Sequence, residues 1–323
     1  MGTSERAEVK KLLSFVIPCY RSEKTIEKVC AEIRETVAQR PEYDYEIIAV
    51  NDCSPDGVLG VLKRLAAEDP KVRVVDLAKN FGKHSAVMAG YSFVRGEFVV
   101  NLDDDCQCPV CELWQLMDAL VQEDCDCATA VYPQKREAAW KRLGSRVNAR
   151  MVDWLIEPPR GVTVENFCVI RRFACDEILR YPNPYPYLSG LLLRATHRVR
   201  MIPMQERERG DGNATGFTLR KSFSLFSNGL TAFSVKPLRV AALLGAVFAL
   251  LGFLFGLVII IRKLAHPEIL MGYSSIMAVQ LFSSGVVLLM LGIIGEYIGR
   301  IYISINRSPQ YVIRETVNLE GEP

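Results

Sequence analysis

The chain has little net charge and few histidines. Its 323 residues contain 39 Lys and Arg against 37 Asp and Glu, a formal net charge of +2, and three histidines. A near-neutral chain lacks the broad positive field that captures nucleic acids, so we expect no nucleic-acid partner. The sequence contains no internal repeat or low-complexity tract, and its 50% of hydrophobic residues excludes disorder for most of the chain.

A secretory signal is not expected, because Met1 to Lys11 is polar and charged. Ten cysteines in a chain without export indicate a reducing, cytosolic compartment. Five of the cysteines lie between Cys106 and Cys127, which raises the alternative of a zinc site. Zinc ligands usually form two well-separated pairs, and no histidine is near this run, so we favour free thiols.

Two long stretches of the C-terminal part carry no charge. Val240 to Ile261 has 22 residues and Met271 to Gly295 has 25. A helix needs about 20 residues to cross a hydrocarbon core of about 30 Å, so each stretch predicts a transmembrane helix. A buried helix of a soluble protein is the alternative, and two such lengths in succession argue against it.

Basic residues flank the two spans and predict their orientation. Those outside the spans are Lys236, Arg239, Arg300, Arg307 and Arg314, whereas the loop between the spans has Arg262 and Lys263. Positive charge favours the cytoplasmic side, so we expect a multi-pass protein of the cytoplasmic membrane with the N-terminal domain and both termini in the cytoplasm.

The segment before the first span interleaves apolar and basic residues. Phe217 to Pro237 therefore predicts an amphipathic helix at the membrane surface, with an ordinary core helix as the alternative. We divide the chain into a catalytic domain at 1–212, a juxtamembrane segment at 213–237, two transmembrane helices at 238–303 and a cytosolic tail at 304–323.

Apolar runs alternate with helical patterns over the first 210 residues. The predicted strands are 12–17, 45–50, 72–77 and 98–102, and the predicted helices are 26–37, 58–65 and 83–94. Such alternation predicts an α/β, Rossmann-like fold with a mostly parallel sheet covered on both faces. Ligands of such sheets bind beyond the carboxyl ends of the strands, where polar residues should be sought.

Two of these strand ends carry aspartates suited to ligand binding. Asp103 and Asp105 follow the fourth predicted strand, and residues two apart in extended chain point the same way. Two carboxylates on one side suit a hard divalent cation, although helix capping is the alternative. Asp52 follows the second strand and is either an acceptor for a nucleobase N–H or a turn residue.

Four motifs at these strand ends resemble those of family 2 glycosyltransferases. They are VIPCY at 16–20, VNDCSPDG at 50–57, KNFGKHSAVMAG at 79–90 and DDDCQ at 103–107. With the C-terminal GEYIGRIY at 295–302, the chain resembles polyprenyl-phosphate glycosyltransferases over residues 12 to 314. These include bactoprenol glucosyltransferases, undecaprenyl-phosphate formamido-arabinose transferase and dolichyl-phosphate mannose synthase.

The resemblance implies a GT-A catalytic domain followed by a two-helix hairpin, and it assigns roles to residues. Asp103 and Asp105, with Gln107 beside them, would bind Mg²⁺ or Mn²⁺ and the donor diphosphate. Catalysis would depend on the same two aspartates and on Arg207, which matches a phosphate-contacting loop that is longer here. The nucleotide-binding residues would be Pro18, Tyr20, Asp52, Lys79, Gly82, Asp103 and Asp104.

The acceptor phosphate is assigned to a basic stretch and to one carboxylate. Arg136 and Arg146 lie beside Trp140, where they would hold a lipid phosphate, or would form a solvated helix face. Glu165 falls near an aspartate that some members of the family place by the acceptor, with a surface carboxylate as the alternative.

A phosphate monoester is anionic at neutral pH and attacks without a strong base, which fits a chain with three histidines. We therefore expect inverting transfer of a sugar from a nucleotide sugar, chiefly a UDP-sugar, to undecaprenyl phosphate for cell-envelope glycan modification. The resemblance also implies a homotetramer. The alternatives are a GDP-mannose-dependent polyprenyl-phosphate mannose synthase and a membrane-anchored nucleotide-sugar-binding scaffold.

Overall fold

The computed structural model describes residues 10–132, 162–184, 186–205, 207, 236–265, 272–306 and 309–319. The chain forms two compact units. The α/β unit consists of residues 1–149, 157–217 and 307–323, and the hairpin unit of residues 150–156 and 218–306. Residues on both sides of the hairpin therefore belong to the α/β unit.

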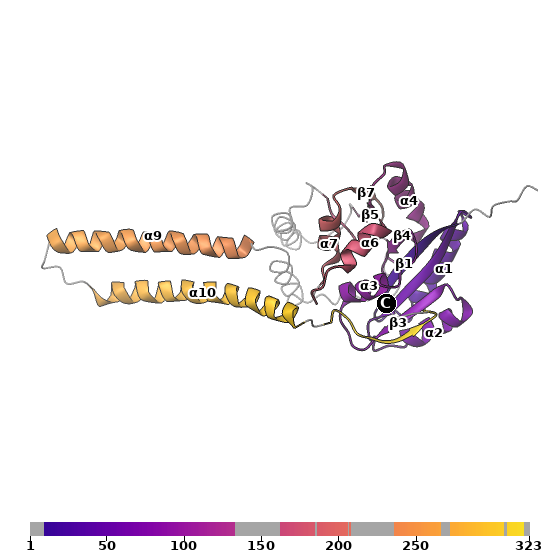
Figure 1. Cartoon of the computed structure of the whole chain (residues 1–323), viewed down its shortest axis with the longest axis horizontal. Helices are drawn as coiled ribbons and strands as arrows, with labels where there is room; N and C mark the ends of the chain where they lie inside the picture. Colours follow the sequence, from indigo (N-terminus) through magenta and orange to yellow (C-terminus); the bar gives the residue numbers. More distant parts are fainter. Residues whose placement is uncertain are drawn as a thin grey trace, which may run out of the picture. The chain divides into compact units, whose positions relative to one another are not determined.

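The described residues of the α/β unit form one mixed sheet (Figure 1). Its strand order is β7-β5-β6-β4-β1-β2-β3-β8. Its strands are β1 (Lys11–Cys19), β2 (Tyr43–Asn51), β3 (Val72–Leu77), β4 (Phe98–Asn101), β5 (Cys127–Val131), β6 (Cys168–Arg171), β7 (Val199–Pro203) and β8 (Ile313–Val317). β4, β1, β2 and β3 run parallel as neighbours, and β6 and β8 flank them antiparallel. The predicted Rossmann-like sheet is confirmed.

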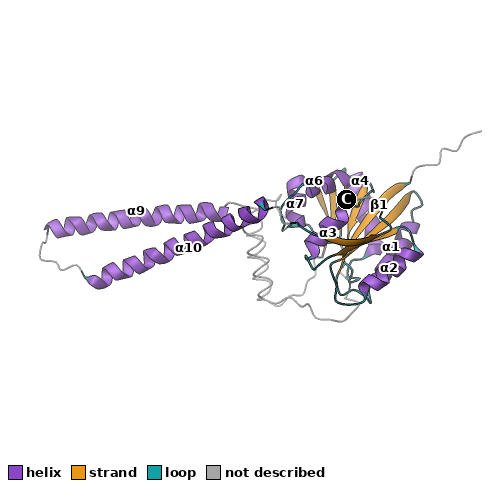
Figure 2. Cartoon of the chain, turned by 60° about the horizontal axis from the view of Figure 1, so that its bottom comes forward, coloured by secondary structure: helices purple, strands orange, loops and turns teal. Residues whose placement is uncertain are grey.

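Helices cover both faces of this sheet (Figure 2). They are α1 (Ile26–Ala38), α2 (Val58–Glu68), α3 (Lys83–Tyr91), the short 3₁₀ turn η1 (Val110–Glu112), α4 (Leu113–Gln122), α6 (Arg172–Leu179) and α7 (Leu188–Ala195). The apolar stripes of α1, α2 and α4 pack with the sheet into one core, in which Phe15, Ile33 and Leu62 are fully buried. The three predicted helices and four predicted strands are all present.

Helix α3 packs closely on the opposite face of the sheet. A Cβ atom at Gly90 would lie 2.5 Å from Cγ1 of Val16 and 3.1 Å from Cγ2 of Val50. The helix can approach β1 and β2 this closely only because residue 90 has no side chain. Through this contact the amino end of α3 is fixed at the carboxyl ends of β1 and β4.

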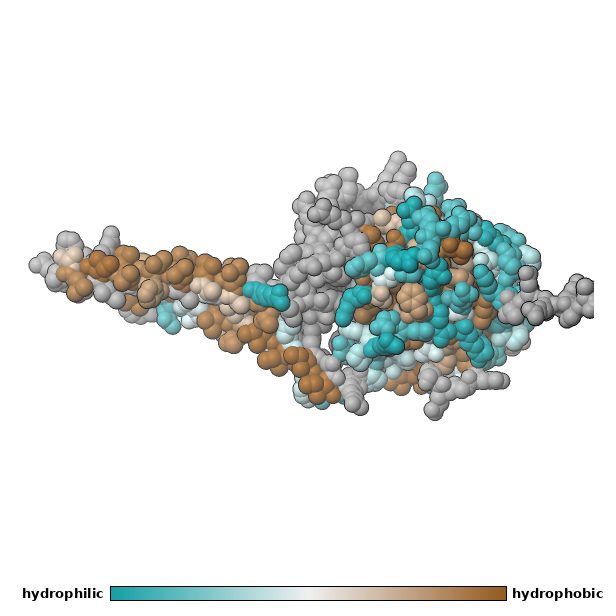
Figure 3. All heavy atoms as spheres, turned by 45° about the horizontal axis from the view of Figure 1, so that its top comes forward, coloured by the Kyte–Doolittle hydropathy of each residue, from teal (hydrophilic) through white to brown (hydrophobic). Residues whose placement is uncertain are grey.

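The hairpin unit contains α9 (Lys236–Ala265) and α10 (Tyr273–Ile305). The two helices contact each other, for example through the rings of Phe248 and Phe282, whose centroids are 5.3 Å apart. Both are long and apolar enough to cross a membrane, as predicted. Their apolar side chains face outward (Figure 3), with Phe253 69% and Leu288 68% exposed. A helix of a soluble core would instead bury such residues. The predicted amphipathic segment lies almost entirely outside the described residues.

The C-terminal tail returns to the sheet. Strand β8 pairs antiparallel with β3, with Val317 opposite Val74 and Ile313 opposite Leu77. The tail was predicted as a cytosolic segment after the second span, and its strand was not foreseen. It covers the edge of β3, which would otherwise present unpaired backbone groups.

Candidate active site

The polar residues after β1, β2, β3 and β4 meet at one rim of the sheet. These four strands are parallel neighbours, so their carboxyl ends lie together. The rim contains Tyr20 after β1, Asp52 after β2, Lys79–Gly82 after β3 and Asp103–Asp105 after β4. The sheet thus assembles the predicted nucleotide and metal residues in one place.

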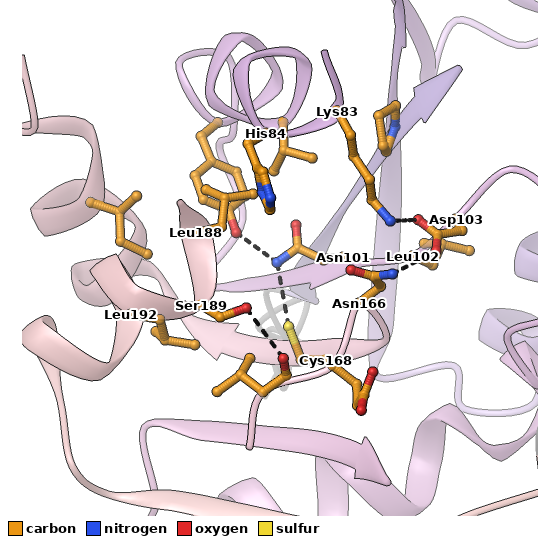
Figure 4. Close-up of a pocket in the computed structure, with 16 residues that line it drawn as sticks. Lys83, His84, Asn101, Leu102, Asp103, Asn166, Cys168, Leu188, Ser189 and Leu192 are labelled. Carbon is orange, nitrogen blue, oxygen red and sulfur yellow. Dashed lines mark hydrogen bonds and ion pairs between the residues drawn. The ribbon is translucent and has the colours of Figure 1, made fainter. Parts of the chain in front are cut away.

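Asp103 sits between two donors at this rim (Figure 4). The Lys83 ammonium forms an ion pair with Oδ1 of Asp103, and the Asn166 amide donates to Oδ2 at 2.9 Å. Asp105 Oδ1 accepts from the backbone N–H of Gln107 at 3.1 Å. Lys83 comes from the first turn of α3 and Asn166 from the chain just before β6. Neither partner of Asp103 was assigned a role from the sequence.

The donor set fits a hard divalent cation that binds together with a diphosphate. Asp103 already accepts a cationic group, and carboxylate oxygens are the ligands that Mg²⁺ and Mn²⁺ prefer. Among the described residues no group of three or more His, Cys, Asp or Glu is arranged as a complete metal site. The two aspartates would therefore hold the ion only with further oxygens from diphosphate or water.

Asp104, between these two carboxylates, faces the other way. Its Oδ2 accepts from the backbone N–H of Tyr20 at 2.9 Å, which ties the end of β4 to the loop after β1. Burial raises the pKa of Asp104 to about 6, and the charges of Asp103 and Asp105 add to this effect. Asp104 positions the loop that carries Tyr20, whose own side chain is 44% exposed.

Asp52 is buried and holds the loop between β3 and α3. Its Oδ1 accepts from the backbone N–H of Phe81 at 2.7 Å and its Oδ2 from that of Gly82 at 2.9 Å. Burial raises the pKa of Asp52, and the two backbone hydrogen bonds oppose this shift. Gly82 adopts a φ of 87°, a conformation that favours glycine. In the same loop the Lys79 ammonium lies 4.9 Å from the ring centroid of Phe81.

A pocket opens beside Asp103, between α3 and α7. We call it the inner pocket; its polar lining residues are Lys83, His84, Tyr91, Asn101, Asp103, Glu165, Asn166 and Ser189. The buried Nδ1 of His84 and Oδ1 of Asn101 have no hydrogen-bond partner among the described residues. The Asn101 amide nitrogen donates to the hydroxyl of Tyr91 at 2.6 Å (Figure 4).

His84 is uncharged at neutral pH. Burial, with a smaller contribution from the neighbouring Lys83 ammonium, lowers the pKa of His84 to about 4. A neutral imidazole and an amide oxygen thus line the inner pocket as uncharged polar groups. Sequence reasoning placed His84 in a motif without a role and missed Asn101, which ends β4 two residues before Asp103.

Arg207 lies next to the predicted metal loop through its backbone. Its N–H donates to the Gln107 carbonyl at 3.1 Å, but its guanidinium bonds Glu32 of α1 at 2.8 Å and the Cys111 sulfur at 2.9 Å. The side chain is therefore held on Glu32 in this structure. The role of Arg207 toward a phosphate stays a prediction.

The predicted acceptor residues are only partly placed. Glu165 lines the inner pocket, and its backbone N–H donates to Oγ1 of Thr129 at 3.0 Å. Arg136 and Arg146 lie outside the described residues. The ten cysteines are free thiols, and within the described part of the chain the Cys106–Cys127 run forms no metal site.

Comparison with known proteins agrees with this geometry. The model of "Glycosyl transferase family 2" matches residues 14–179, and that of "GtrB C-terminal hairpin" matches residues 236–301. The chain is 31% identical to an uncharacterized glycosyltransferase of Bacillus subtilis, YkcC, over 96% of this chain and 95% of that protein. It is 30% identical to the SfII prophage-derived bactoprenol glucosyl transferase of Shigella flexneri, over 94% and 98%.

Among solved structures, the chain is similar to glucosyl-3-phosphoglycerate synthase from Mycobacterium tuberculosis in complex with phosphoglyceric acid. The TM-score is 0.51 with 18% identity, over 68% of this chain and 78% of that one. This likeness shows a shared GT-A fold.

The mixed sheet with its parallel centre and the match to the family model define a GT-A glycosyltransferase. The chain belongs to glycosyltransferase family 2, and its hairpin is of the GtrB type.

Proposed function

We propose that this enzyme transfers a sugar, with inversion, from a UDP-sugar to undecaprenyl phosphate at the cytoplasmic face of the membrane. The proposal depends on one observation. The same chain contains a rim with Asp103 and Asp105, which suits a metal ion and a diphosphate, and a hairpin of two helices whose apolar side chains are exposed. A soluble acceptor would not require the hairpin. The name of the Shigella flexneri relative, a bactoprenol glucosyl transferase, supports a polyprenyl acceptor.

The rim residues suit a nucleoside diphosphate. Tyr20 offers an exposed ring for a base, and Asp52 shapes the loop that borders the same site. Pro18 lies near the end of β1 and Lys79 follows β3, both at this rim. Pro18 also lines the inner pocket. Asp103 and Asp105 would hold Mg²⁺ or Mn²⁺, with Gln107 next to them. The ion, when bound, neutralises charge on the departing diphosphate.

The inner pocket is the space in which the sugar would lie, because it opens directly beside Asp103. An acceptor phosphate oxygen would form a bond to the anomeric carbon while the bond from that carbon to the diphosphate oxygen breaks. The nucleoside diphosphate leaves with the bonding electron pair, and no proton has to be removed from the phosphate dianion. The chain's own residues position the reactants and balance their charge.

Lys83 and the arginines would supply positive charge around these phosphates. The Lys83 ammonium already faces the rim, and Arg207 would reach a phosphate after leaving Glu32. Arg136 and Arg146 are proposed to hold the acceptor phosphate, with Glu165 at the pocket wall. We also propose cytoplasmic termini and a homotetramer.

Turnover by purified full-length protein tests the proposal. Vesicles containing undecaprenyl phosphate would be incubated with UDP- and GDP-sugars and Mg²⁺ or Mn²⁺, and lipid-linked sugar would be identified by mass spectrometry. We expect product from one UDP-sugar, with a β anomeric linkage by NMR. Product from a GDP-sugar alone would replace the proposed donor. Absence of lipid-linked sugar with every donor would refute the proposed acceptor.

A further inference from the structure

The C-terminal tail makes a set of contacts that its place after the hairpin does not predict. Beyond the pairing of β8 with β3, the backbone N–H of Ala78 donates to the Val312 carbonyl at 2.8 Å. The Gln310 amide donates to the carbonyl of Asn183 at 2.8 Å and to that of Tyr181, in the loop between α6 and α7. The tail therefore touches the α6–α7 loop near its start and the end of β3 a few residues later.

Arg314 connects the tail to the residues beside Asp52. One guanidinium nitrogen donates to the Ala78 carbonyl at 2.8 Å, and the other pairs with Oδ2 of Asp76 at 3.7 Å. Asp76 is 2% exposed, and its Oδ1 accepts from the Asn51 amide at 2.7 Å. The Asn51 side-chain oxygen in turn accepts from the backbone N–H of Ser54 at 3.2 Å.

These contacts reach both loops that surround Asp52. Asn51 ends β2 and Ser54 lies in the loop after it, and Ala78 leads directly into Lys79–Gly82 after β3. Asp52 joins the two loops through its bonds to Phe81 and Gly82. Without Arg314, the buried Asp76 carboxylate would lose its cationic partner, and Ala78 would lose a charged donor. Both loops would then be less firmly held.

We propose that β8 is a strap that holds the nucleotide-binding loops in their binding geometry, with Arg314 as its positioning residue. The inference rests on the proposed function for the identity of the ligand. Arg314 touches no substrate group in this scheme; it acts through Asp76, Asn51 and the carbonyl of Ala78. The tail that follows α10 in sequence thus supports the loops of the proposed nucleotide site.

The test compares two full-length variants that each remove side-chain contacts of the tail. R314A breaks the contacts to Asp76 and Ala78, whereas K63A breaks the exposed ion pair between Lys63 of α2 and Glu315, 2.7 Å apart. K63A leaves both nucleotide loops untouched and is the matched control. The probes are UDP and GDP with Mn²⁺, measured by calorimetry, and hydrogen exchange at the Phe81 and Gly82 amides without ligand.

We expect R314A to weaken UDP binding about fivefold, as is typical of residues that act on a site without touching its ligand. Exchange at Phe81 and Gly82 should become faster, KM for the nucleotide sugar should rise, and kcat should stay within about twofold. R314K should restore part of the affinity, because lysine keeps the charge but cannot make both contacts in the same geometry. K63A should behave like the wild type.

Equal UDP affinity and equal amide exchange in R314A, K63A and the wild type would overturn the strap. So would a loss of thermal stability in R314A without faster exchange at Phe81 and Gly82. If R314A does not fold, R314K against K63A decides by the same two measurements. A wild-type protein that binds neither UDP nor GDP would refute the proposed donor instead, and amide exchange alone would then decide the strap.

Discussion

We predict that Lys83 competes with a divalent cation for Asp103, so that removal of the Lys83 charge strengthens metal binding. The Lys83 and Asp103 side chains are 39% and 22% exposed, so solvent weakens their ion pair. An ion pair at such exposure is worth about 1 kcal/mol. A metal ion that binds Asp103 would either displace the Lys83 ammonium or be repelled by its charge. Removing about 1 kcal/mol of competition corresponds to about a fivefold lower Kd for the ion.

The variant K83M keeps the length of the side chain and removes its charge. Binding of Mn²⁺ would be followed by the electron paramagnetic resonance signal of the free ion, with full-length protein and UDP. K63M is the matched control, because Lys63 of α2 pairs with Glu315 and lies outside the proposed nucleotide site. We expect about fivefold tighter Mn²⁺ binding in K83M, no change in K63M, and slower sugar transfer in K83M because a cation near the diphosphate is lost. Unchanged or weaker Mn²⁺ binding in K83M would refute the competition.

Three further predictions concern metal use and stability. D103N and D105N should each lower lipid-linked product formation by about 100-fold or more, with unchanged thermal midpoints, since each removes a carboxylate facing the leaving group; full activity of both variants in chelator would contradict this. G90A should lower the free energy of unfolding by about 1–3 kcal/mol, because its Cβ would lie 2.5 Å from a β1 side chain; an unchanged denaturation midpoint would show that the helix shifts freely. Arg40 donates to both carboxylate oxygens of Asp118 at 2.6 Å and lowers the pKa of that carboxyl. The ion pair therefore stabilises the fold above the pKa that Asp118 has in the unfolded chain, and this stabilisation is lost as the pH falls through the lower pKa of the folded state. R40M should therefore melt below the wild type at pH 7 and converge with it in acid; a constant difference at all pH values would exclude this linkage.

Local sequence patterns determined most of the α/β unit's central part. The strand at 72–77 was predicted with the bounds it has, and α1 and α2 differ from their predicted ranges by a few residues at one end. These elements follow from apolar spacing, which each segment carries within itself. The same reasoning found the two apolar helices, because their length exceeds what a soluble core helix needs.

The strand ends were predicted to meet because parallel strands with helical crossovers leave their carboxyl ends at one edge. That topological rule predicts that Asp52, Asp103 and Asp105 lie together. It does not give the partner of each side chain. The resemblance assigned Asp104 to the nucleotide, and only the structure shows its carboxylate bonded to the Tyr20 backbone.

Pairings between residues far apart in the chain could not be predicted from the sequence. The Asn166 amide on Asp103, the Arg207 guanidinium on Glu32 and the inner pocket between α3 and α7 join segments that share no local pattern. Strand β8 is the clearest case, since a five-residue segment after a membrane-type hairpin carries too little periodicity to reveal its partner. Spacing along a chain encodes which element forms, whereas the partner of an edge strand or of a charged side chain depends on what the folded sheet brings within reach.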